Sequence, residues 1–139
     1  MRSALLLAMF VLSSQVADAR EIRRDNIPEA FLGTWATTPD GCKDGGKNGS
    51  KDTAKSPIVL AARSYTGPAG NCDVDYVMET PGRGGAIYSV RMHCQPAQQK
   101  TKAFTNLIIR QGDGEQISLG PTFESLAAHR RCPAAESPK

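Results

Sequence analysis

Side chains that could carry chemistry are few in this sequence. It contains two histidines, His93 and His129, and four cysteines. An enzyme built from these residues would be a hydrolase in which His93 acts as the base and Asp73 orients it. Such a base needs a nucleophile or bound water beside it in a concavity, and neither histidine stands near a serine in a recognisable nucleophile motif. We therefore predict that the protein is not an enzyme.

A zinc site is the second possibility raised by residue type. Both histidines lie close to cysteines, in His93-Cys94 and His129-x-x-Cys132. If these cysteines form disulfides, only two histidines from different strands remain, without a cluster of acids to complete a tetrahedral site. We therefore expect no bound metal.

The glycine-rich segment Gly41–Asn48 nearly matches a phosphate-binding loop. Asn48 stands where that motif has the Ser or Thr that binds Mg²⁺, and no helix is expected to follow. Aligned instead as a calcium loop from Asp40, the segment places Cys42 at the third position and Lys51 where a bidentate acid is needed. The sequence therefore predicts no cofactor.

The first 19 residues are typical of a secretory signal peptide. Arg2 precedes the apolar run Ala4–Leu12, and Ala17–Ala19 has the small-x-small pattern of a cleavage site. The apolar run is about half the length of a membrane-spanning helix. We expect a soluble protein that begins at Arg20 and is periplasmic or secreted, with no membrane span.

The remaining chain is expected to be one domain. Removing 19 of 139 residues leaves 139 − 19 = 120, which suits a single modest core. We assign residues 20–27 to a flexible arm, residues 28–132 to a β domain and residues 133–139 to a disordered tail. The net charge of +3 is small and its basic residues are scattered, so no nucleic-acid partner is expected, and we expect a monomer.

The fold is organised around a predicted β-hairpin that runs from Cys72 to Cys94. When the chain is folded about Gly82–Gly84, the pairs on one face are apolar: Cys72 with Cys94, Val74 with Met92, Tyr76 with Val90, and Met78 with Tyr88. The other face pairs opposite charges, Asp75 with Arg91 and Asp73 with His93. A slip by one residue would exchange the two faces, so this register is favoured.

The hairpin register also selects the disulfides. Four cysteines allow three connectivities. Since Cys72 lies opposite Cys94, these two are expected to pair, which leaves Cys42 with Cys132. An even number of cysteines in an exported protein favours disulfides over free thiols.

Further short strands complete the predicted fold. A turn of helix at residues 28–31 leads into a strand at 32–38, followed by a long polar loop at 39–56, a strand at 57–63 and a turn at 64–71. A second hairpin, 101–110 with 115–120, is expected to pair Leu107 with Leu119 and Ile109 with Ile117. Residues 123–132 are predicted as a last strand, with a helical turn as the alternative. The sequence thus predicts an all-β fold, an antiparallel up-and-down barrel or sandwich of about seven strands with two disulfides. Its expected core includes Trp35, Val74, Tyr76, Val90, Met92, Ile109 and Ile117.

The segment FLGTWA, with Gly33 and Trp35, resembles the Gly-x-Trp entry to the first strand of lipocalins. The resemblance implies that Trp35 plugs one end of a barrel and that an arginine from the last strand, Arg130 or Arg131, stacks across it.

The order of Trp35, the four cysteines and Arg130-Arg131-Cys132-Pro133 also resembles that of small secreted α-proteobacterial proteins of uncharacterised function. Size, export and disulfides are similar to those of periplasmic protease and lysozyme inhibitors.

These observations favour a binding protein, for which two kinds of partner compete. A secreted or periplasmic protein could be bound by the basic loop with Lys43, Lys47 and Lys51, or by Arg83 at the hairpin tip. A small apolar ligand would instead need a hollow barrel. We expect side chains to fill the barrel, and this expectation favours the protein partner. A pocket above about 300 Å³ would favour the small ligand instead.

Overall fold

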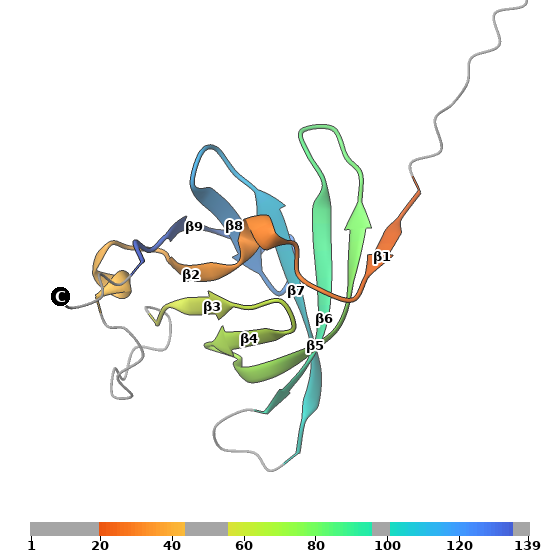
Figure 1. Ribbon diagram of the computed structural model, residues 1–139, viewed down its shortest axis with the longest axis horizontal. Helices are drawn as coiled ribbons and strands as arrows, with labels where there is room; N and C mark the ends of the chain where they lie inside the picture. The colour runs from red at the N-terminus through yellow and green to blue at the C-terminus, as the bar shows by residue number, and fades with distance from the viewer. Residues whose placement is uncertain (1–19, 44–55, 96–100, 135–139) are drawn as a thin grey trace, which may run out of the picture.

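The computed structural model describes residues 20–43, 56–95 and 101–134 and contains nine β-strands (Figure 1). The strands are β1 (Ile22–Arg24), β2 (Gly33–Ala36), β3 (Ile58–Leu60), β4 (Ser64–Gly67), β5 (Gly70–Thr80), β6 (Ile87–Gln95), β7 (Ala103–Gln111), β8 (Gln116–Gly120) and β9 (Ala127–Arg131). Two single-turn 3-10 helices, η1 (Glu29–Phe31) and η2 (Asp40–Cys42), flank β2. The prediction of an all-β fold is confirmed.

Eight of these strands close into an antiparallel barrel. The sheet order is β1-β5-β4-β3-β2-β9-β8-β7-β6, and pairing of β5 with β6 closes the ring from β2 to β9. Strand β1 lies outside the ring and adds to β5 (Figure 1). Closure removes the free edges that a sandwich would leave. Of the two predicted architectures, barrel and sandwich, the structure is therefore a barrel. It has eight strands in the ring rather than about seven.

Antiparallel order gives the barrel two distinct ends. Strands β2, β4, β6 and β8 finish at one end, where β3, β5, β7 and β9 begin; we call this the mouth. The other end, which we call the plug end, receives η1 and the β3–β4, β5–β6 and β7–β8 turns. Figure 1 shows the β5–β6 hairpin rising beyond the body of the barrel, with β1 along its outer side.

Strand alternation builds the core. Every second residue points inward, and six of the seven side chains expected in the core are at most 4 % exposed. These six are Trp35, Val74, Val90, Met92, Ile109 and Ile117. The seventh, Tyr76, is half-buried, and the reason is a change of register inside the central hairpin.

A β-bulge at Asp75 divides that hairpin. Cys72 lies opposite Cys94 and Val74 opposite Met92, as predicted, but Tyr76 lies opposite Arg91 rather than Val90. One extra residue in β5 exchanges its two faces beyond the bulge, so the pairing of Asp75 with Arg91 and of Met78 with Tyr88 was wrong. Val77, 0 % exposed, takes the core position.

The exchange at the bulge gives Tyr76 a different role. It faces outward, and the guanidinium of Arg23 in β1 lies 4.2 Å from its ring centroid. Arg24 pairs with Glu79 of β5 at 2.5 Å. These side-chain contacts and the backbone ladder attach β1 to β5. The segment expected to be a flexible arm therefore contains a strand, and Ile27 behind it is 2 % exposed.

The second hairpin keeps its predicted faces with a different register. Ile109 lies opposite Leu119 rather than Ile117, a shift of two residues. Because side chains alternate with a period of two, Leu107, Ile109, Ile117 and Leu119 remain inside. The turn is shifted by one residue along the chain, since Gly112 N–H donates to the carbonyl of Gln116.

Two further predictions of local structure need correction. Residues 64–71 were expected to form a turn, but they begin with strand β4. Ser64 and Thr66 face outward and Tyr65 faces the core, which is the alternation of a strand. The last strand is β9, which confirms a strand over a helix but starts only at Ala127.

Both predicted disulfides are present. Cys72 pairs with Cys94 across β5 and β6, and Cys42 of η2 pairs with Cys132, which follows β9. The second bridge lies beside the seam where the first and last strands of the ring meet.

Candidate functional site: the mouth of the barrel

The plug end is closed by Trp35, Arg131 and η1. The indole Nε1 of Trp35 donates to the Phe31 carbonyl at 2.8 Å. The Arg131 guanidinium lies 4.3 Å from the Trp35 ring and donates to the carbonyls of Leu32 and Ala30 at 2.5 and 2.6 Å. Three consecutive carbonyls of the η1 turn are therefore bound by two core-facing side chains.

Of the two candidate arginines, Arg131 rather than Arg130 stacks on Trp35. Trp35 lies directly opposite Arg131 in the ladder between β2 and β9, and opposed residues share a face. Arg130 points the other way and is exposed. Gly33 leaves room for the arginine, because a Cβ there would lie 2.9 Å from Arg131 Nη1 and its φ of +130° disfavours other residues.

We predict that Arg131→Ala and Arg130→Ala differ sharply in stability. Loss of Arg131 removes a cation–π contact and two charge-assisted hydrogen bonds, which should lower the free energy of unfolding by about 2–4 kcal/mol. Loss of exposed Arg130 should change it by less than about 0.5 kcal/mol. Urea denaturation of both variants measures the difference, and equal values would show that the contacts of Arg131 do not stabilise the plug.

The mouth end contains a largely apolar pocket of about 370 Å³. Side chains from β3, β4, β6, β7 and β8 form its wall, and the β4–β5 turn and the β8–β9 connection form its rim. Its lining residues are Ile58, Tyr65, Pro68, Ala69, Met92, Thr105, Asn106, Leu107, Leu119, Gly120, Pro121 and Ser125. Its volume exceeds the value of about 300 Å³ above which a small ligand is favoured over a protein partner.

Tyr65 is the most deeply buried polar group of this pocket. It is 4 % exposed, and its hydroxyl lies under the β4–β5 turn, where a Cβ on Gly67 would come within 2.5 Å of it. Burial raises the pKa of the Tyr65 phenol, and a hydrogen bond from the Ala69 backbone lowers it by less. The phenol is therefore neutral and protonated near pH 7.

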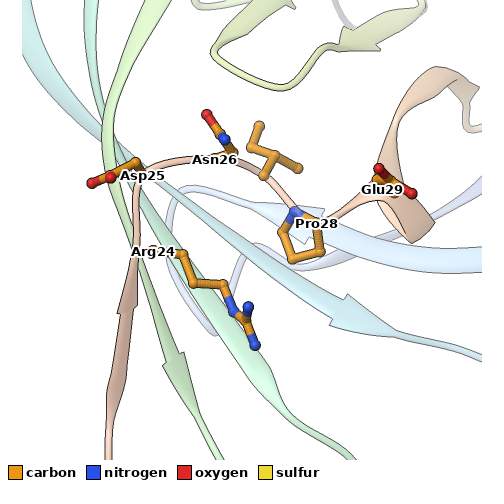
Figure 2. A pocket seen from close by; sticks show the side chains of 6 residues that line it. Arg24, Asp25, Asn26, Pro28 and Glu29 are labelled. Atoms are coloured by element: carbon orange, nitrogen blue, oxygen red, sulfur yellow. The ribbon is translucent and has the colours of Figure 1, made fainter.

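A second hollow, of about 410 Å³, lies at the bend between β1 and η1. Figure 2 shows its lining side chains, which include Arg24, Asp25, Asn26 and Glu29, pointing in different directions from one stretch of chain. Convergent polar groups, which mark a ligand site, are not present in this bend. We therefore place the candidate site at the mouth.

The residues proposed for a hydrolase lie on the outer face of the barrel. Asp73 is opposite His93 as predicted, but its carboxylate binds Lys102 Nζ at 2.6 Å, and this contact lowers the pKa of Asp73. The His93 ring stacks on Phe104, with 4.0 Å between centroids. Neither pocket described above includes these residues.

His129, by contrast, lies inside the barrel opposite Ile117 and is 8 % exposed. Its Nδ1 is 2.8 Å from the Ala127 carbonyl, to which a protonated Nδ1 donates. Burial lowers the pKa of His129, and the hydrogen bond to Ala127 raises it by less. The folded protein therefore holds this ring neutral where an unfolded chain would begin to protonate it.

This difference predicts a pH effect on stability. Below the unfolded histidine pKa of about 6.5, the unfolded state binds more protons, so the free energy of unfolding should fall as the pH drops from about 7.5 to about 5.5. His129→Leu should remove much of this fall, whereas His93→Gln should keep it. Urea denaturation at both pH values measures it; an unchanged slope in His129→Leu would contradict the assignment.

Two of the residues predicted to bind a protein, Arg83 and Lys43, lie within the described segments and on separate elements. Arg83 is exposed at the tip of the β5–β6 hairpin, at the plug end. Lys43 follows η2 beyond β2, is exposed and pairs with Asp40 at 3.1 Å. Lys47 and Lys51 lie outside the described residues.

Within residues 20–43, 56–95 and 101–134, no three His, Cys, Asp or Glu side chains gather as metal ligands. In these segments no helix has the length and apolar character needed to cross a membrane.

Comparisons with known protein families, curated proteins and solved structures find no match to this chain. Its architecture is an eight-stranded antiparallel barrel with two disulfides. The two disulfides indicate an oxidising environment outside the cytoplasm.

Sequence reasoning missed the pocket as a site. Leu107 and Leu119 were placed on an inward face, but Tyr65 was assigned to a turn. The alternation of Ser64, Tyr65 and Thr66 was the available signal, and it was masked by the Gly and Pro residues that follow.

Proposed function

We propose that this protein is an exported, non-catalytic carrier that binds a small apolar ligand in the mouth of its barrel. The observation that supports the proposal is the apolar pocket of about 370 Å³, since small-molecule sites begin near about 300 Å³ and have mostly apolar walls. Its position supports it too. One end of the barrel is sealed by Trp35 and Arg131, so a ligand enters from the other.

A protein partner is the second candidate, and the exposed tip of the β5–β6 hairpin favours it. Gly84 and Gly85 adopt positive φ values of 89° and 114° in this turn, which presents Arg83 beyond the barrel. A pull-down of periplasmic and secreted proteins with wild type and Arg83→Ala tests this candidate. A partner lost in the variant supports it, whereas a co-purifying small molecule without a partner supports the carrier.

The carrier proposal predicts that a bulky side chain in the mouth blocks binding. Thr105 lines the pocket opposite Met92, so Thr105→Trp should fill part of the space and weaken a fluorescent apolar probe, N-phenyl-1-naphthylamine, at least about tenfold. Thr66→Trp is the matched control, because Thr66 lies on the outer face of the neighbouring strand β4 and is exposed.

Fluorescence titration of the three proteins measures the effect. The control should bind the probe as wild type does, and circular dichroism should confirm that both variants fold. Probe binding that is absent in wild type, or equally strong in Thr105→Trp, would contradict a site in the mouth.

A further inference from the structure

The polar side chains that line the mouth pocket are all uncharged. Among the residues that the structure describes, none of the twelve that line it carries a charge, and its polar side chains are Tyr65, Thr105, Asn106 and Ser125. Asp73 and Lys102, a charged pair of the neighbouring strands, bind each other on the outer face. A ligand in this pocket therefore meets apolar surface and neutral hydrogen-bonding groups.

We infer that the pocket selects uncharged ligands, with an apolar body and one neutral polar group that accepts a hydrogen bond from Tyr65, and rejects the matching carboxylates. This inference rests on the proposed carrier function. It adds that the ligand is uncharged and that Tyr65 donates a hydrogen bond to its polar group.

Rejection of anions follows from the cost of burial. An ionised carboxylate that leaves water needs a cation or several donors in return. The described wall offers no cation, so a carboxylate should bind at least about tenfold more weakly than a neutral ligand of the same length.

The donor role of Tyr65 follows from its surroundings. Tyr65 lines the pocket, and its hydroxyl lies beside Gly67 of the β4–β5 turn. A phenol oxygen that accepts a bond from the Ala69 backbone can still donate its own proton. A buried phenol that stays protonated is a donor to a ligand oxygen at neutral pH. Its ring, packed in the apolar core beside Ile58 and Cys72, is held in place for that contact.

Three ligands of equal chain length test the selection by charge. Decan-1-ol, methyl decanoate and decanoate are used to displace N-phenyl-1-naphthylamine from the full mature protein at about pH 7.5, where a carboxylic acid is ionised. The alcohol and the ester should displace the probe at concentrations at least about tenfold lower than decanoate does. Equal or stronger displacement by decanoate would overturn the inference while leaving the carrier proposal intact.

A pair of tyrosine variants tests the contact itself. Tyr65→Phe keeps the ring and should weaken decan-1-ol by about 3-fold to 10-fold, the value of one hydrogen bond, without weakening the probe. Tyr88→Phe is the control, because Tyr88 packs against Phe31 at the plug end, and it should bind both as wild type does. Unchanged affinity for the alcohol in Tyr65→Phe would show that Tyr65 does not donate a hydrogen bond to the ligand. If wild type binds neither probe nor alcohol, the carrier proposal itself fails.

Discussion

Replacing Cys42 and Cys132 together by alanine should lower the free energy of unfolding by about 4–5 kcal/mol. The bridge joins residues 90 apart in sequence, and the loop-entropy relation gives about 4.6 kcal/mol for a loop of that length. It also lies beside a short pairing, because β2 and β9 share only two paired positions, Trp35 with Arg131 and Ala36 with Arg130. Strands β3 and β4 also share two, but they follow each other in the chain, whereas β2 and β9 do not. Without the bridge, the ring should open first at this seam.

Equilibrium denaturation in urea measures this effect, and the other bridge provides the comparison. Cys72 and Cys94 are 22 residues apart, for which the same relation gives about 3.4 kcal/mol. A loss below about 1 kcal/mol for the Cys42 and Cys132 double variant would contradict the view that this bridge stabilises the closed barrel.

Trp35→Ala should lower the free energy of unfolding by about 3–5 kcal/mol. The indole is 1 % exposed, so its removal leaves a large cavity at the plug end. The Phe31 carbonyl loses its donor and the Arg131 guanidinium loses the ring beneath it. These losses add to the cavity, and the variant should unfold at a much lower urea concentration than wild type.

Phe123→Ala is the control for Trp35→Ala. Phe123 is also a large aromatic residue but is 58 % exposed, in the β8–β9 connection, and its truncation should change the free energy of unfolding by less than about 0.5 kcal/mol. If the two variants are equally stable, Trp35 is not a plug.

The fold was largely predictable because two kinds of local pattern agreed. Alternating apolar residues set the inward faces, and the hairpin register fixed which cysteines meet. The pattern could not reveal the bulge at Asp75, because one inserted residue leaves the composition of the strand unchanged while exchanging its faces. Tyr76 was therefore expected in the core, where Val77 lies instead.

The site was less predictable than the fold. A pocket depends on how far inward-facing side chains from several strands fill the barrel, and that balance is not visible in any one strand. The choice between Arg130 and Arg131 is of the same kind, because it depends on which residue of β9 lies opposite Trp35. Charged residues at the tip and in the polar loop attracted attention in the sequence, whereas the neutral wall of the mouth did not.

The most direct test of a ligand site in the mouth is an NMR titration of the ¹⁵N-labelled mature protein with decan-1-ol. We expect the amide shifts to concentrate on Tyr65, Ala69, Thr105 and Leu119, which line the pocket. The amides of Arg83 and Trp35, at the plug end, should be unaffected. Saturable shifts confined to the plug end, or no saturable shifts at all, would contradict it.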